Sequence, residues 1–174
     1  MDQGLDFESV VARFYAPLYQ FAFSLTRAEA EACDLTQQTF YIWGTKGHQL
    51  REPAKVKTWL FTTLHRQFLE SRRRATRFPQ EDLEAAEPAL PVISPDVLER
   101  LDAALAIKAL ASVDEVYQSP VALFYLEDCS YKEIAEILDV PLGTVKSRIS
   151  RGIGQLQRLL ADAPAPNRSQ IQPT

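Results

Sequence analysis

Cysteine and histidine are scarce in this chain of 174 residues, which contains two of each. Cys33 and Cys129 lie far apart and lack the CxxC spacing of metal ligands or redox pairs, so we expect neither a disulfide framework nor a zinc site. His48 and His65 have no acid or nucleophile near them in the sequence that would complete a catalytic set. The sequence therefore predicts no metal and no cofactor.

Motifs of catalysis and of membrane insertion are also missing. The chain has no glycine-rich phosphate loop, no nucleophile elbow and no paired catalytic carboxylates, so we expect it not to be an enzyme. It has no run of about eighteen apolar residues, and its amino terminus carries Asp2, Asp6 and Glu8 in place of a basic lead and an apolar signal region. We expect no membrane insertion and a cytoplasmic location.

The segment from Ser130 to Leu160 has the pattern of a helix, a tight turn and a second helix. Ser130 and Glu133 have the spacing of a capping box at the start of the first helix, and Pro141 ends that helix. Gly143 is expected to permit close approach of the two helices. The apolar residues at helical spacing are Ile134, Ala135, Ile137 and Leu138 in the first helix, and Val145, Ile149, Leu156 and Leu160 in the second.

The second of these helices is basic although the net charge of the chain is −4. Residues 142–160 contain four cations and no carboxylate, whereas residues 127–139 contain five carboxylates and one lysine. A basic helix face is often only a solvated surface, but binding to phosphates depends on local charge. The pattern favours a DNA-binding helix-turn-helix, with contacts from Thr144, Lys146, Ser147, Arg148 and Arg151.

The amino-terminal half predicts three helices. The first carries an apolar stripe from Phe7 to Leu25, and Pro17 should kink it or split it in two. The second extends from about residue 28 to 46, and the third from about 54 to 77. The third ends in a cluster of cations, since five arginines lie between Arg66 and Arg77. One or two would satisfy the helix dipole, so the excess favours a nucleic-acid contact.

The distribution of proline and charge predicts two small helical domains. Residues 78–95 hold four of the eleven prolines and a run of acids, and they have no sustained apolar stripe, which is typical of a flexible linker. The predicted all-α fold therefore has domains at residues 1–77 and 96–160. Residues 161–174 are rich in proline, glutamine and asparagine and are expected to be a disordered tail.

Taken together, the motifs resemble those of bacterial sigma factors of the sigma-70 family, specifically the small two-domain extracytoplasmic-function (ECF) group. Residues 34–40 (DLTQQTF) are similar to the acidic DLVQETF-like stretch of the family. Trp59-Leu60, followed by a polar helix that ends in arginines, resembles the segment that melts the −10 promoter element. Residues 130–138 and 143–148 match the helix-turn-helix that binds the −35 element almost residue for residue.

The resemblance implies three binding sites on this chain. It implies promoter DNA at the −35 element for the five helix-turn-helix residues named above, and at the −10 element for Trp59, Arg66, Arg72, Arg73, Arg74 and Arg77. It implies contacts with core RNA polymerase for Asp34, Gln37, Gln38, Phe40 and Trp43. It also implies an anti-sigma protein as a regulator.

One departure from the family pattern motivates a hypothesis about regulation. Gln38 stands where the family usually has glutamate, so the polymerase-binding face has lost a charge. Phosphorylation of Thr36 or Thr39 would restore negative charge there. The simpler alternative is that Gln38 makes neutral hydrogen bonds to the same partner.

Two other functions remain open from the sequence. A sigma-like decoy, which binds an anti-sigma protein without reading DNA, would be expected to lose the basic helix and the arginine cluster, and this chain keeps both. A stand-alone helix-turn-helix regulator would need a domain for dimerisation or ligand binding. The amino-terminal half resembles a polymerase-binding domain instead.

Overall fold

A computed structural model describes residues 6–76 and 103–162, and every regular element in these two ranges is a helix. The predicted all-α fold class is confirmed. The expected linker (78–95) lies outside the described residues, as does the tail beyond residue 162. The last helix ends at Ala161, one residue after the predicted end of the second domain.

The amino-terminal domain consists of α1 (Phe7–Thr26), α2 (Glu29–Lys46) and α3 (Val56–Ala75), with the short 3-10 turns η1 (Gly47–Gln49) and η2 (Pro53–Lys55) between α2 and α3. α1 continues through Pro17, so the prediction that this proline splits the helix is wrong. The apolar side chains on both sides of it, Phe14, Leu18 and Phe21, are buried, and their packing offsets the hydrogen bond that proline cannot make. Phe21 packs on Phe61 of α3 with ring centroids 5.4 Å apart.

The carboxyl-terminal domain consists of α4 (Ala103–Leu110), α5 (Glu115–Tyr125), α6 (Tyr131–Leu138) and α7 (Leu142–Ala161). The predicted capping box is present, since Glu133 N donates to Ser130 Oγ at 3.2 Å and Ser130 N donates to Glu133 Oε2 at 2.7 Å. α6 ends at Asp139 in a left-handed conformation, φ 55°. Along α7, Val145, Ile149 and Leu156 are buried as the apolar pattern predicts. The sequence analysis did not anticipate α4 and α5.

A glycine does allow close approach of two helices in this domain, but it is not Gly143. A Cβ at Gly143 would meet no atom within 4 Å, so that position is open and the predicted role is wrong. A Cβ at Gly152 would lie 2.5 Å from Val121 Cγ2 and 3.0 Å from Tyr117 Cβ, both on α5. Gly152 is therefore the residue that lets α7 pack closely on α5.

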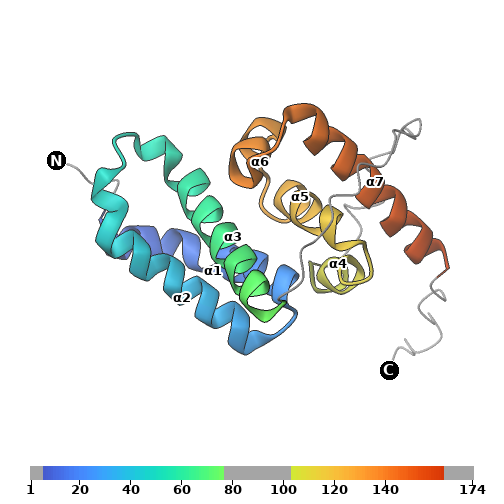
Figure 1. The fold of residues 1–174 in the computed structure, drawn as a ribbon, viewed down its shortest axis with the longest axis horizontal. Helices are drawn as coiled ribbons and strands as arrows, with labels where there is room; N and C mark the ends of the chain where they lie inside the picture. The colour runs from blue at the N-terminus through green and yellow to red at the C-terminus, as the bar shows by residue number, and fades with distance from the viewer. Residues whose placement is uncertain (1–5, 77–102, 163–174) are drawn as a thin grey trace, which may run out of the picture.

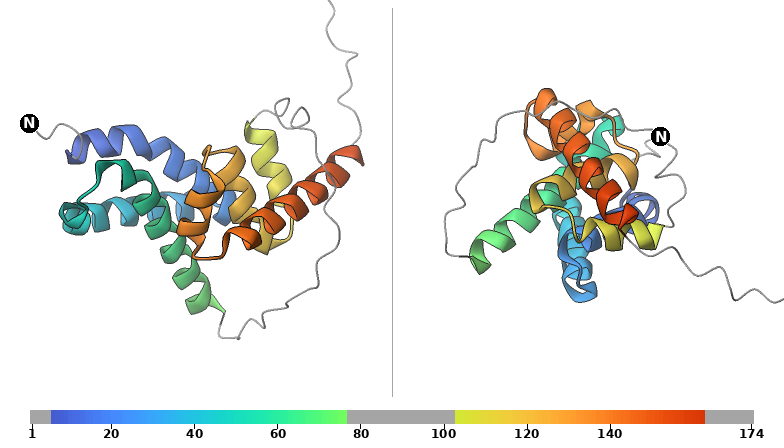
Figure 2. Two further views of the ribbon diagram at one scale, coloured as in Figure 1. Left: turned by 90° about the horizontal axis from the view of Figure 1, so that it is seen from above. Right: turned by 90° about the vertical axis from the view of Figure 1, so that its right-hand side faces the viewer.

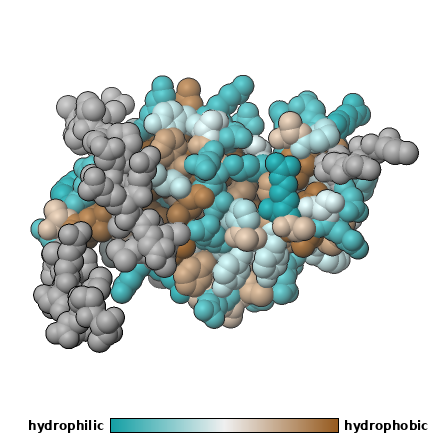
Figure 3. Space-filling view, turned by 180° about the vertical axis from the view of Figure 1, so that it is seen from behind, coloured by the Kyte–Doolittle hydropathy of each residue, from teal (hydrophilic) through white to brown (hydrophobic). Residues whose placement is uncertain are grey.

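The two domains pack against each other. α3 lies against α6, and α1 contacts both α4 and α5. The two groups of helices lie side by side in Figure 1 and remain in contact in the rotated views of Figure 2. The buried apolar residues of both domains form a single cluster. Seen from behind, the described residues expose apolar side chains between hydrophilic ones (Figure 3).

Candidate nucleic-acid interface

The amino-terminal half of α7 presents the side chains that the sequence predicts for DNA contact. Lys146 is exposed, and Thr144, Ser147 and Arg148 are half-buried, while the intervening Val145 is buried against the rest of the domain. The N-cap residue of α7 is Pro141, and no side chain caps the first turn, so its amide groups are available to an anion. Short polar and cationic side chains beside such a helix end suit a phosphate backbone and the base edges of a major groove.

Two arginines of α7 are not freely exposed. Arg151 is half-buried, and its Nε has no hydrogen-bond partner among the described residues. Arg148 lies near His65 of α3, which belongs to the other domain. Burial first, and then the Arg148 charge, lower the pKa of His65 from 6.5 to about 4. The helix predicted to contact DNA therefore has one cation, Arg148, close to the amino-terminal domain.

The end of α3 carries the predicted arginine cluster on the surface. Arg66, Arg72, Arg73 and Arg74 are all exposed, whereas Arg77 lies outside the described residues. Arg74 pairs with Glu70 at 2.6 Å on the same helix. Arg72 forms an ion pair with Glu115 of α5, and its guanidinium lies 5.6 Å from the centre of the Phe68 ring. One of the predicted −10 contacts is thus engaged by the carboxyl-terminal domain.

The predicted polymerase contacts divide into two faces of α2. Asp34, Gln37 and Gln38 are exposed, but Phe40 and Trp43 are only 6% and 4% exposed. Phe40 stacks on Tyr15 of α1, and Trp43 meets Trp59 of α3 edge-on with ring centroids 5.2 Å apart. Most of both rings therefore lies in the core between the three helices, and little of either is left to meet a partner, so their polymerase contact stays a prediction. Trp59, predicted at the −10 element, is half-buried.

The threonines of α2 also lie in the core. Thr36 and Thr39 are fully buried, and their hydroxyl groups donate to the carbonyl oxygens of Ala32 at 2.7 Å and Leu35 at 2.8 Å. A kinase could not reach either hydroxyl in this fold, and a phosphate would not fit there. The structure contradicts the phosphorylation hypothesis, because these positions face the interior and not the surface that Gln38 occupies.

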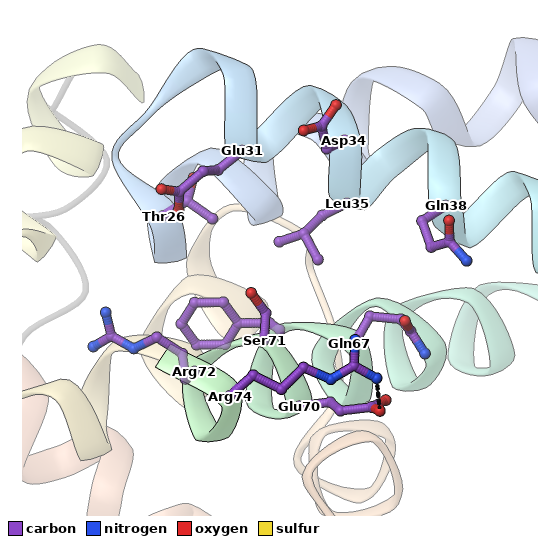
Figure 4. A pocket seen from close by; sticks show the side chains of 11 residues that line it. Thr26, Glu31, Asp34, Leu35, Gln38, Gln67, Glu70, Ser71, Arg72 and Arg74 are labelled. Atoms are coloured by element: carbon purple, nitrogen blue, oxygen red, sulfur yellow. Dashed lines mark hydrogen bonds and ion pairs between the residues drawn. The ribbon is translucent and has the colours of Figure 1, made fainter. Parts of the chain in front are cut away.

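An open groove lies between α2 and α3 (Figure 4). In the figure, Asp34 and Gln38 lie on the α2 side, and Gln67, Glu70 and Arg74 lie on the α3 side. The groove joins the predicted polymerase-binding face to the predicted −10 face. The sequence analysis missed Glu31 and Gln67 in its lining, although Glu31 precedes Asp34 and Gln38 at the i, i+3, i+7 spacing of one helix face.

A second hollow, beside the 3-10 turns, was also missed. It combines the exposed ring of Phe7 with His48 and Arg51, a combination that can stack an unpaired base, while the buried Trp43 contributes only to its lining. Gly47 is required there, because a Cβ would lie 2.6 Å from the Trp43 ring. Tyr41, at 69% exposed, is a further aromatic on the outer face of α2. The sequence could have indicated this residue, because Asp34, Gln37 and Tyr41 have the i, i+3, i+7 spacing of one helix face.

Glu127, between α5 and α6, is a buried carboxyl group at the contact between the domains. It is 7% exposed, and its Oε1 has no hydrogen-bond partner among the described residues. Burial raises its pKa from 4.5 to about 7, Lys57 of α3 opposes that rise, and Asp128 adds to it. Lys57 Nζ also donates to the backbone carbonyl of Glu127 at 2.6 Å.

This raised pKa predicts a pH-dependent stability that Glu127→Gln should remove. The folded state binds a proton that the unfolded state releases above about pH 4.5, so the Glu127 contribution is lost as the pH rises through 7. His65 acts in the opposite direction, since its lowered pKa costs stability as the pH falls below about 6.5. Because His65 is present in both E127Q and the native protein, its effect cancels in the difference between them. The stability of E127Q relative to the native protein should increase by about 2–3 kcal/mol between pH 4.5 and 7.5.

Urea unfolding at a series of pH values measures this difference. Asp128→Asn serves as the control, because Asp128 is exposed beside Glu127. Its stability difference from the native protein should change much less with pH. A difference between E127Q and the native protein that is the same at pH 4.5 and 7.5 would contradict the assignment.

The described residues offer no sign of a resident metal. Among residues 6–76 and 103–162 there is no group of three or more His, Cys, Asp or Glu side chains placed to hold an ion. Within the same ranges, no helix combines the length and the apolar character needed to cross a membrane.

Comparison with known families gives matches over both domains. The model of sigma-70 region 2 matches residues 10–78, and the model of sigma-70 region 4 matches residues 104–156. The first ends with the arginine cluster of α3, and the second contains the α6–α7 helix-turn-helix.

Individual proteins match over most of the chain. The ECF RNA polymerase sigma factor SigE of Mycolicibacterium smegmatis is 36% identical over 149 residues, which are 83% of this chain and 57% of SigE. SigW of Bacillus subtilis is 26% identical over 167 residues, 90% of this chain and 89% of SigW. Among solved structures, the sigma factor RpoE in complex with the anti-sigma factor NepR from Bartonella quintana has a TM-score of 0.71 at 29% identity, covering 91% of this chain and 99% of RpoE.

Proposed function

Because the chain belongs to the ECF group of the sigma-70 family, we propose that it binds core RNA polymerase and directs it to promoters through their −10 and −35 elements. The observation that carries this proposal is the amino-terminal half of α7, an acid-free helix end that presents Thr144, Lys146 and Arg148 next to uncapped amides. In this role the chain has no catalytic activity of its own, and it works in the cytoplasm, where the chromosome and polymerase are.

The −35 element is the proposed ligand of α7. Thr144, Lys146, Ser147 and Arg148 lie on the part of the helix that enters a major groove in helix-turn-helix proteins. Arg151 is one turn further along and is placed for a phosphate. Capping of α6 by Ser130 and Glu133 holds the supporting helix in position behind α7.

The −10 element is the proposed ligand of the amino-terminal domain. Arg66, Arg73 and Arg74 lie exposed on α3 and can follow a single-stranded backbone, while the hollow lined by Phe7, Trp43 and Arg51 can hold an unstacked base. Trp59 packs edge-on against Trp43, which lines this hollow. Arg77 is proposed to extend the same cationic surface.

The exposed face of α2 is the proposed polymerase-binding surface. Asp34, Gln37 and Gln38 supply one charge and two amides, and Tyr41 adds an exposed ring to them. The domain boundaries at 1–77 and 96–160 are consistent with this division of work. An anti-sigma protein is a proposed regulator, since the RpoE structure that this chain resembles is a complex with one.

Reconstituted transcription tests the proposal. Core polymerase with the purified chain should initiate transcripts from promoters in a genomic library of the source organism that core polymerase alone ignores. A chain that binds core polymerase but starts no transcript from any promoter would reject the sigma-factor role. A chain that binds an anti-sigma protein and neither polymerase nor DNA would be the decoy.

A further inference from the structure

Gln155 of α7 and Asp114, the residue before α5, exchange two hydrogen bonds. The backbone N–H of Asp114 donates to Gln155 Oε1 at 2.9 Å, and Gln155 Nε2 donates to Asp114 Oδ2 at 2.7 Å. The two residues lie 41 positions apart in the sequence, so the pair joins separate elements of the carboxyl-terminal domain. Two parallel hydrogen bonds fix both a distance and an orientation, whereas a single bond leaves a side chain free to swivel.

Asp114 gives up a local hydrogen bond to make this contact. It is the N-cap residue of α5, but its side chain accepts no hydrogen bond from the first turn of that helix. An N-cap aspartate ordinarily accepts one there, which stabilises the helix end. Ser130 caps α6 in that ordinary way. The Asp114 carboxylate is instead directed to α7, so a tertiary contact takes the place of a local one.

The turn that carries Asp114 is held in place without help from α7. Within residues 111–114, the N–H groups of Ser112 and Val113 donate to carbonyl oxygens of α4 at 3.0 and 3.1 Å. The Val113 carbonyl accepts a bond of 2.7 Å from Nε2 of the buried Gln118 on α5, and the Val113 side chain is only 3% exposed. Because this turn is fixed to α4 and α5, the pair with Gln155 sets the position of α7 and not that of the turn.

Gln155 lies at a point on α7 from which it controls the orientation of the helix. Gly152, one turn earlier, brings α7 against Val121 and Tyr117 of α5 and sets how closely the two helices approach. Apolar contacts are not directional and still allow the helix to pivot there, whereas the Gln155 pair opposes that rotation. Lys146 is six residues before Gly152, or about 9 Å along the helix axis. A pivot of about 10° would move Lys146 by about 1.5 Å, which exceeds the tolerance of a hydrogen bond to a base edge.

We propose that Gln155 and Asp114 are positioning residues for promoter recognition, because their reciprocal pair holds α7 at the angle at which its amino-terminal half reads the −35 element. Neither residue is assigned a contact with DNA. This inference rests on the proposed function, which makes the −35 element the ligand of α7. Contacts with base edges need close placement, whereas contacts with phosphates carry no sequence information. Loss of the pair therefore lowers the preference for one sequence more than it lowers the affinity for DNA in general.

An exchange of the two side-chain types tests the pair without changing the net charge. Gln155→Glu places a carboxylate against that of Asp114, so one hydrogen bond becomes a repulsion. Asp114→Asn alone keeps an acceptor oxygen for Gln155 Nε2, so it retains both bonds. When both substitutions are combined, the new asparagine amide donates to the new glutamate, and the pair is restored with its polarity reversed. The matched control is Gln157→Glu, the same change at a half-buried position further along α7.

The measurement is the ratio of the affinities of the full chain for a selected, preferred duplex and for a duplex of random sequence. Gln155→Glu should lower this ratio at least about threefold, a part of what one base contact contributes. Asp114→Asn, the combined variant and Gln157→Glu should each keep the ratio within about twofold of the native value, because their base contacts are unchanged. An added charge weakens binding to both duplexes alike, and Gln157→Glu measures that effect. A contact that only stabilised the fold would change both affinities in proportion to the folded fraction and would leave the ratio unchanged.

The outcomes separate this inference from the proposed function. Asp114 is exposed and Gln155 is half-buried, so the variants keep the core of the domain. A native chain with a sequence preference that Gln155→Glu leaves intact would overturn only the positioning role, as would a lowered ratio that Asp114→Asn fails to restore. A native chain without any preference would overturn both the positioning role and the proposed −35 contact of α7. A lowered ratio that returns in the combined variant supports the positioning role.

Discussion

Replacing Thr36 by glutamate should unfold the amino-terminal domain. Thr36 is fully buried in α2, and its hydroxyl group already donates to Ala32, so a longer carboxylate at this position would have neither room nor a partner. A buried charge without a partner costs about 3 kcal/mol or more, which is a large part of the stability of a small domain. Loss of the cooperative thermal transition, followed by circular dichroism, would show this.

Exposed positions on the same helix provide the control for Thr36→Glu. Gln37→Glu and Gln38→Glu introduce the same charge on the surface, so each should leave the melting temperature nearly unchanged. Gln38→Glu also restores the family residue on the proposed polymerase-binding face, so its affinity for core polymerase can be compared with that of the native chain. A stably folded Thr36→Glu protein would mean that this side of α2 is not the core.

Replacing Arg148 by alanine should weaken the preference for a −35 sequence while leaving polymerase binding intact. Arg148 is on the part of α7 that is proposed to read base edges, and α7 is in the domain that does not carry Asp34, Gln37 and Gln38. The loss of one such contact costs about 1–3 kcal/mol, or roughly 5- to 150-fold in affinity for the preferred site. Selection of preferred duplexes, followed by titration with the native protein and the variant, measures it.

Arg158→Ala is the matched control for this experiment. It removes the same charge from the exposed carboxyl-terminal part of α7, where the Arg158 Nε donates to the Gly154 carbonyl at 3.3 Å. This variant should weaken binding to all duplexes to a similar extent, as a lost phosphate contact does, and should keep the sequence preference. If the Arg148→Ala variant kept the native sequence preference, Arg148 would not be the residue that reads the −35 element.

Local signals in the sequence were sufficient for most helices. The capping box at Ser130, the turn of Asp139, Val140 and Pro141 after α6, and the 3.6-residue apolar period of α7 each act within one or two turns, so each was visible before any tertiary contact was known. α5 was missed because Pro120 interrupts its pattern, yet the helix continues, with Gln118, Pro120 and Val121 buried.

The sequence analysis placed Phe40 and Trp43 on the polymerase-binding face of α2, whereas both lie on its buried side. Four consecutive apolar residues, Phe40 to Trp43, cover most of the circumference of a helix, so they do not identify its inner face. The inner face is the stripe of Ala32, Thr36, Thr39, Phe40 and Trp43, which has regular i, i+3, i+4 spacing. Thr36 and Thr39 made this inner face hard to recognise, because threonine is a polar residue. Its hydroxyl group can nevertheless be buried when it donates to a backbone carbonyl of its own helix.

The sequence by itself determined α1, α2, α3, α6 and α7, the acid-free face of α7 and the family to which these motifs belong, because all three depend on neighbours in the chain. Only the tertiary structure decided that the domains close on each other. That closure depends on Lys57 with Glu127, Arg72 with Glu115, and His65 with Arg148, pairs that are far apart in sequence. No local period or propensity encodes such pairs, since they meet only when two completed surfaces fit together.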